Sequence, residues 1–199
     1  MEYIFIGLGN PSDEYKDTRH NAGRIMLEAV LSRFSDDDIS WEEDKKTKVL
    51  VFRNKKPKLL AVLPQTFMNK SGDAVARYVK SKKTAGGLVV FHDDLDLPLG
   101  TVRLAWNKGD GGHRGLKSVI KSVGTQEFLR IRIGISPAGA KGRARKLVGE
   151  EKVLKHILSK FKPEELRTIK KLSALTAEAL LCMIKEGREK AMSLYNAKT

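Results

Sequence analysis

The sequence predicts an α/β domain in which a mixed, twisted β-sheet is covered by α-helices on both faces. Short apolar, β-branched runs alternate along the chain with amphipathic helical patterns, and this alternation is typical of layered α/β folds. The run at residues 87–93 is apolar over most of its length, as in a central strand that is covered on both sides. A chain of 199 residues can bury a sizeable core, so we expect a single domain over residues 1–199.

Six runs have the composition of β-strands. The first, YIFIG, comes almost at the start of the chain. The last, LRIRIGI, alternates apolar and basic residues, which favours a position near a sheet edge or with one wet face. The predicted strands are residues 3–7, 48–52, 58–63, 87–93, 101–106 and 129–135.

Helical patterns fill the intervals and the C-terminal part. Apolar residues recur at three- and four-residue spacing in residues 21–34, 71–80 and 115–123. Pro163, followed by two glutamates, predicts a helix start, because proline suits the first turn and acidic groups suit the positive end of the helix. An apolar stripe then predicts one long helix near residues 163–195.

Two charged segments have no periodicity and are predicted to be loops. Residues 35–48 are mostly acidic and basic, whereas residues 138–152 combine small residues with a basic cluster. The second segment is a candidate flexible arm for nucleic acid.

Charge and composition narrow the class of function. The net charge is +14, which favours a polyanionic partner, most simply nucleic acid. Cys182 is the single cysteine, so no disulfide can form within the chain, as is common in a reducing cytoplasm. No apolar run reaches the roughly 18 residues that a membrane span needs, and we read no signal peptide at the N-terminus. We therefore expect a cytoplasmic protein without a membrane partner.

The loop after the first strand, GLGNPSDEYKDTRHNAG, is rich in glycine, amide and polar side chains. It is not a dinucleotide-binding loop, because Ser12 stands where a third glycine is needed and no helix begins there. A second glycine-rich stretch, residues 108–118, opens a helix and could hold an anion with its exposed amides.

Histidine and aspartate residues are the candidates for chemistry. The run HDDLD begins at the end of the strand predicted over residues 87–93, and alternation places Asp93 on the opposite face from His92 and Asp94. Two interpretations remain open at this point. One is a metal site formed by His92, Asp94 and Asp96; the other is a His–Asp pair that activates water without a metal.

Five segments together resemble the bacterial-type peptidyl-tRNA hydrolase family. They follow one another in the order and with the spacing of that family, and the combination of GLGN, TRHNAG, TFMN and GGHxGLKS is highly specific. The segments are residues 7–23, 63–75, 92–100, 109–118 and 130–135.

The resemblance implies a cytoplasmic esterase that cleaves the ester between a peptide and the 3′ ribose of its tRNA. It implies peptidyl-tRNA as the partner, a monomer, no obligate protein partner, and no metal or other cofactor. By the same resemblance, His20 activates water, Asp93 orients His20, Asn10 positions the ester, and Asn69 steadies the water or the oxyanion. The implied substrate-binding residues are Tyr15, Phe67, Met68, Asn69, His113 and Arg114.

The chain departs from the family pattern at positions that would meet the tRNA. Arg114 stands where relatives often carry asparagine, and Ala105 where they often carry a basic residue. Since arginine can pair with phosphate, we expect the tRNA backbone to be held by Arg103, Lys108, Arg132, Lys141, Arg143, Arg145 and Lys146. A protein that keeps this fold but only binds RNA is the alternative.

Overall fold

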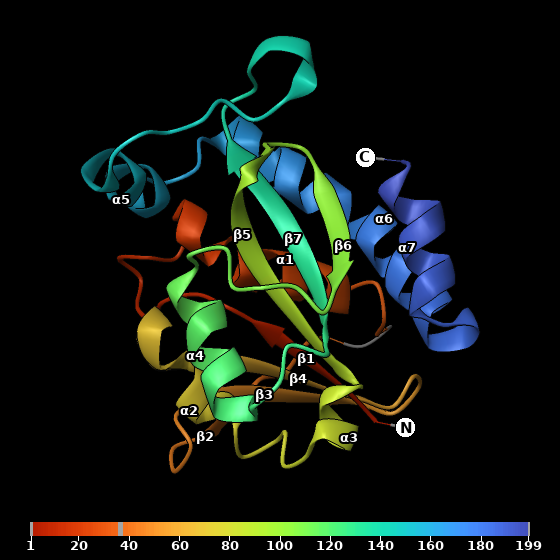
Figure 1. Ribbon diagram of the computed structural model, residues 1–199. Helices are drawn as coiled ribbons and strands as arrows, with labels where there is room; N and C mark the ends of the chain where they lie inside the picture. Colours follow the sequence, from red (N-terminus) through yellow and green to blue (C-terminus); the bar gives the residue numbers. More distant parts are fainter. Residues whose placement is uncertain (1, 36–37, 199) are drawn as a thin grey trace.

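A computed structural model describes residues 2–35 and 38–198, without the side chains of Lys82, Lys83 and Lys141 (Figure 1). Its centre is one seven-stranded sheet with the order β2-β3-β4-β1-β5-β7-β6. The strands are β1 (Tyr3–Gly7), β2 (Glu42–Asp44), β3 (Val49–Asn54), β4 (Leu59–Pro64), β5 (Leu88–Pro98), β6 (Val102–Trp106) and β7 (Leu129–Ser136).

The middle of the sheet is parallel and its margins are antiparallel. β1 pairs in parallel with β4 and β5, and β5 pairs in parallel with β7. The pairs β2–β3, β3–β4 and β6–β7 are antiparallel. The mixed sheet predicted from the sequence is confirmed, and β5 is central in it. The last residue of β1, Gly7, lies opposite Phe91, so the loop that follows β1 reaches the middle of β5, where Asp93 lies, while β5 continues to Pro98 beyond the strand predicted over residues 87–93.

Helices cover both faces of the sheet, and each face has its own core. On one face α1 (Ala22–Leu31) and α6 (Pro163–Glu186) pack around Phe91. On the other, α2 (Ser71–Val75) and α4 (Arg114–Val123) pack around Val90. The remaining segments are η1 (Arg19–Asn21), η2 (Met68–Lys70), α3 (Lys82–Ala85), η3 (Ala140–Gly142), α5 (Glu150–Leu158) and α7 (Arg188–Asn196).

The C-terminal part differs from the single helix expected over residues 163–195. The helix ends at Gly187, whose φ of +93° lies in the region that favours glycine, and α7 begins after it. α7 then turns back along β6 (Figure 1), where the side chain of Asn196 exchanges hydrogen bonds of 2.8 and 2.9 Å with the backbone of Leu104. Residues 185–190 carry no apolar side chain between Ile184 and Ala191, so the interrupted stripe and Gly187 were signals of the break that the single-helix prediction passed over.

Both segments predicted as loops contain some regular structure. β2 lies within residues 35–48 and pairs with β3. In residues 138–152, Ala138 and Ala144 form an isolated bridge around η3, and α5 begins at Glu150. Among the described residues, no helix is long and apolar enough to cross a membrane.

Candidate active site

The loop after β1 brings His20 to Asp93, in the middle of β5. Gly23 makes this approach possible, because a Cβ there would lie 2.3 Å from the carbonyl oxygen of Phe91 and 2.7 Å from that of Leu8. The start of α1 is thus pressed against the end of β1 and the inner part of β5. The preceding turn, η1, consequently presents His20 to Asp93.

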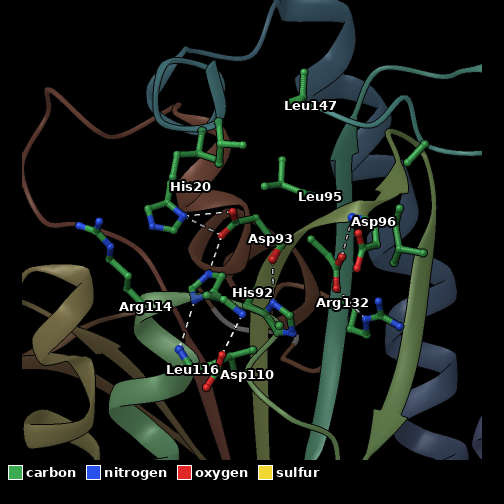
Figure 2. Close-up of a pocket in the computed structure, with 18 of the residues that line it drawn as sticks. His20, His92, Asp93, Leu95, Asp96, Asp110, Arg114, Leu116, Arg132 and Leu147 are labelled. Atoms are coloured by element: carbon green, nitrogen blue, oxygen red, sulfur yellow. Dashed lines mark hydrogen bonds and ion pairs between the residues drawn. The ribbon is translucent and has the colours of Figure 1, made fainter. Parts of the chain in front are cut away.

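His20 and Asp93 form a buried pair. Nδ1 of His20 lies 3.0 Å from both carboxylate oxygens of Asp93 (Figure 2), and the two residues are 7% and 4% exposed. Burial lowers the pKa of His20, but the charge and hydrogen bond of Asp93 outweigh it, so the pKa is above its ordinary value of 6.5. Because Nδ1 carries the proton and donates it to the carboxylate of Asp93, Nε2 has a free lone pair and can act as a base.

His113 holds the same carboxylate from another side. Its Nδ1 accepts the backbone N–H groups of Gly115 and Leu116, at 3.1 and 3.2 Å, and so caps the first turn of α4. Because Nδ1 accepts, the proton of neutral His113 must be on Nε2, which donates to Oδ1 of Asp93 at 2.9 Å. Burial alone would raise the pKa of Asp93, but His20 and His113 hold it well below its ordinary value. The resemblance implied only that His113 lines the cleft, and no pattern in the sequence indicated this capping role.

His20, Asp93 and His113 also form a potential metal-binding group, since their ligand atoms lie within 4.8 Å of one another. A metal at Nε2 of His113 would require the proton to move to Nδ1. That proton would then face the two backbone N–H groups that Nδ1 accepts. The arrangement therefore fits a hydrogen-bonded dyad of His20 and Asp93 better than a metal centre.

The alternative metal site of His92, Asp94 and Asp96 does not assemble. Nδ1 of His92 donates to the backbone oxygen of Asp93 at 2.7 Å, and Asp94 pairs with Arg132 at 2.7 Å. The only group of metal-binding character that converges among the described residues is the one around Asp93. Burial and the neighbouring His113 lower the pKa of His92 to about 3, so its ring is neutral near pH 7.

Asn10 is held with its amide facing the same cavity. Its Oδ1 accepts the backbone N–H of Met68 at 2.8 Å, which leaves the Nδ2 hydrogens for a ligand. Asn21 fixes the backbone of Asn10 on both sides, by accepting from its N–H at 2.8 Å and donating to its carbonyl at 3.0 Å. The sequence motifs predicted no role for Asn21, although it follows His20 directly.

The dyad opens into a large cavity of about 1500 Å³. Most of the residues predicted for the site line it. They are Asn10, His20, Phe67, Met68, Asn69, Asp93, His113, Arg114, Arg103, Lys108, Arg132, Arg143 and Lys146.

Three predicted residues are placed differently. Tyr15 and Arg145 are not among the residues that line the cavity, and the side chain of Lys141 is outside the described part of the chain. Tyr15 instead accepts the hydroxyl of Thr18 with its backbone oxygen, at 2.8 Å. It contributes to the shape of the loop rather than to the cavity wall.

The basic residues around the cavity differ in how free their side chains are to bind phosphate. Arg132 is paired with Asp94, and Arg103 donates to the backbone oxygen of Asn196. Arg143 and Lys146 are exposed on the segment before α5. The side chain of Arg114 is 70% exposed and pairs loosely with Glu150 at 3.5 Å.

A buried His–Asp pair, amide donors and a basic rim meet around one open cavity of an α/β fold, and these are the groups that hydrolysis of an anionic ester requires. Comparison with known sequences agrees. A profile described as peptidyl-tRNA hydrolase matches residues 4–199. The chain belongs to the peptidyl-tRNA hydrolase family.

Individual relatives support this membership over nearly the whole chain. The chain is 40% identical to a peptidyl-tRNA hydrolase of Persephonella marina, covering 97% of this chain and 96% of the relative. It is 37% identical to one of Trichodesmium erythraeum, covering 98% and 89%. Among solved structures, the peptidyl-tRNA hydrolase of Acinetobacter baumannii superposes with a TM-score of 0.83 at 29% identity, covering 98% and 94%. The alternative of a protein that only binds RNA is not supported by the family or by these names.

Proposed function

We propose that this chain hydrolyses the ester between peptide and tRNA with water that is activated by His20. The observation that carries this proposal is the contact between Nδ1 of His20 and the carboxylate of Asp93, at 3.0 Å. It fixes one tautomer of His20 and leaves Nε2 as a base within the cavity.

The reaction then proceeds in two steps. Nε2 of His20 takes a proton from water while the water oxygen bonds to the ester carbonyl carbon. The bond to the ribose 3′ oxygen next breaks, and that oxygen takes the proton back from His20. Asp93 stays ionised throughout and stabilises the imidazolium.

Amide donors stabilise the negative charge that develops on the carbonyl oxygen. Nδ2 of Asn10 and the side chain of Asn69 both belong to the cavity wall. One oxyanion donor contributes about 10²–10³ in rate, and a ribose oxygen leaves more readily than an amide nitrogen. A single base with two amides is therefore sufficient chemistry for an ester.

The rim of the cavity suits the tRNA. Arg114, Arg143, Lys146 and Lys108 surround the opening, and phosphate contacts by such residues position a nucleic acid without reading its sequence. The peptide would lie over Phe67 and Met68. We further propose that the protein acts as a cytoplasmic monomer, with residues 1–199 forming one catalytic domain.

The test is release of tRNA from an N-acetylated aminoacyl-tRNA, with the unblocked aminoacyl-tRNA as the control substrate. The wild type should cleave the blocked substrate and spare the unblocked one. His20→Ala should bind tRNA normally and cleave neither. Cleavage by His20→Ala at the wild-type rate would refute the role of His20.

A further inference from the structure

The turn that carries His20 has little to hold it in its own sequence. η1 spans only Arg19–Asn21, and the residue before it, Thr18, makes no side-chain cap. The hydroxyl of Thr18 donates backwards to the carbonyl of Tyr15, at 2.8 Å. A 3₁₀ turn of this length is weak on its own. The packing of α1 at Gly23 holds the C-terminal side of this turn, so contacts from elsewhere must hold its N-terminal side.

Those contacts come from residues 159–161, which join α5 to α6. The backbone N–H of Arg19 donates to the carbonyl of Ser159 at 3.0 Å, and that of Phe161 donates to the carbonyl of Asp17 at 2.9 Å. Thr18 and Lys160 form an isolated antiparallel bridge between the two segments. The backbone on both sides of Thr18 is thus tied to the α5–α6 connection.

The side chain of Arg19 reinforces this attachment with three contacts. Its Nε donates to the hydroxyl of Ser159 at 3.2 Å, and one of its terminal nitrogens lies 2.9 and 2.8 Å from the two carboxylate oxygens of Glu165. Its guanidinium also lies over the ring of Phe161, 4.9 Å from the centroid. Arg19 is only 8% exposed, so these charge-assisted bonds are shielded from water.

Glu165 belongs at the same time to the first turn of α6. One of its carboxylate oxygens accepts the backbone N–H of Lys162 at 2.8 Å, which completes the start of that helix. Arg19 therefore binds a carboxylate whose position is already fixed by the first turn of α6. α6 packs against α1 across the core. The contact between Arg19 and Glu165 therefore fixes the turn that carries His20 to a well-packed helix.

We propose that Arg19 is a positioning residue for the reaction: through Ser159 and Glu165 it fixes the turn so that His20 meets Asp93 in one tautomer. The proposal deepens the proposed function and rests on the role of His20 as the base. Arg19 does not line the cavity and is nearly buried, so it does not act as a phosphate contact.

The experiment compares Arg19→Ala, Arg19→Lys and Glu165→Gln, below the melting temperature of each protein. Arg167→Ala and Glu164→Gln are matched controls, because both residues are on the first turns of α6 and lie outside the site. Displacing a catalytic group by about 1 Å can cost 10²-fold, so we expect Arg19→Ala to lower kcat at least tenfold. KM and its salt dependence should stay as in the wild type. Arg19→Lys should recover part of the loss, and the controls should stay within twofold.

A second readout follows the ring of His20 directly. In protein with ¹⁵N-labelled histidine, at a pH well above the pKa of His20, the wild type should show His20 as a single neutral tautomer with the proton on Nδ1, assigned by its loss in His20→Ala. In Arg19→Ala the two ring nitrogens should move towards averaged shifts, and in Glu165→Gln they should move in the same direction. The double variant should be no worse than Arg19→Ala, because both changes break one linkage.

The outcomes separate this proposal from the proposed function. An inactive wild type would refute the proposed function, while the ring shifts would still test the positioning of His20. A kcat of Arg19→Ala within twofold of the wild type, a loss confined to KM, or unchanged His20 shifts would overturn the proposal. If Arg19→Ala does not fold, Arg19→Lys and Glu165→Gln carry the same test.

Discussion

Nε2 of His113 lies 2.9 Å from Oδ1 of Asp93, the carboxylate that also binds His20. The same imidazole accepts two backbone N–H groups at the start of α4 through Nδ1. His113 thus has two roles: it stabilises the start of α4, and it orients the carboxylate of Asp93. Its two ring nitrogens have separate partners, which allows the two roles to be separated by mutation.

Two substitutions of His113 should separate its effect on the free energy of unfolding from its effect on kcat. His113→Ala removes the cap and should lower the free energy of unfolding by about 1 kcal/mol. His113→Asn should restore most of the capping but not the contact with Asp93, because the side chain is shorter. Both variants should lose kcat, since Asp93 is then held from one side only. Urea unfolding together with single-turnover hydrolysis checks this; an Asn variant as active as the wild type would contradict the role of His113 towards Asp93.

The pH dependence of hydrolysis should follow the ionisation of His20. Because Asp93 raises the pKa of His20 above 6.5, the neutral base is lost as pH falls through a value above 6.5. The nearby Arg114 cation opposes protonation and lowers that pKa. Arg114→Ala should therefore move the acidic limb of kcat/KM to higher pH, whereas Arg114→Lys should leave it close to its wild-type position. An acidic limb that does not move in Arg114→Ala would be evidence against this electrostatic link.

The exposed basic residues before α5 should carry part of the tRNA affinity. Arg143→Ala and Lys146→Ala should each weaken binding for all tRNA sequences and reduce the salt slope by about 0.7–0.9 for every phosphate that the variant no longer neutralises. Filter binding between low and moderate salt measures the slope. Lys45→Ala is the control, since Lys45 is exposed in the turn between β2 and β3 and does not line the cavity. Equal slopes in the wild type and both rim variants would remove this segment from the interface.

Hydrolysis should not depend on a metal ion. The capping bonds of His113 leave its Nε2 protonated and aimed at Asp93, which disfavours coordination at the one converging group among the described residues. Prolonged dialysis against a chelator should leave kcat unchanged, with tRNA supplied free of divalent cations. A loss of activity that added zinc or manganese restores would require a different mechanism.

The fold class could be predicted from the sequence because its main determinants are local. The apolar run of β5 and the helical stripes of α1 and α4 each fit within one stretch of chain. β2 escaped prediction because the segment EED has no strand composition and forms through its pairing with β3. The break at Gly187 could have been predicted, because a glycine flanked by charged residues interrupts the apolar stripe between Ile184 and Ala191.

The site was predictable only in part. The identity of His20, Asp93 and Asn10 followed from the resemblance of short motifs. Their mutual geometry depends on residues far apart in the chain. Arg19 and Glu165 are neighbours only after α6 has folded against α1, so no local pattern connects them.

The central claim is that His20 and Asp93 act as one unit, and a double-mutant cycle on single-turnover hydrolysis of N-acetylated aminoacyl-tRNA tests it most directly. We predict that His20→Ala and Asp93→Asn each lower the rate of the chemical step about 10²–10⁴-fold. The double variant should fall no further than the less active single variant, with tRNA affinity unchanged in all three. Losses that multiply in the double variant, or an Asp93→Asn protein with the wild-type rate, would contradict the dyad.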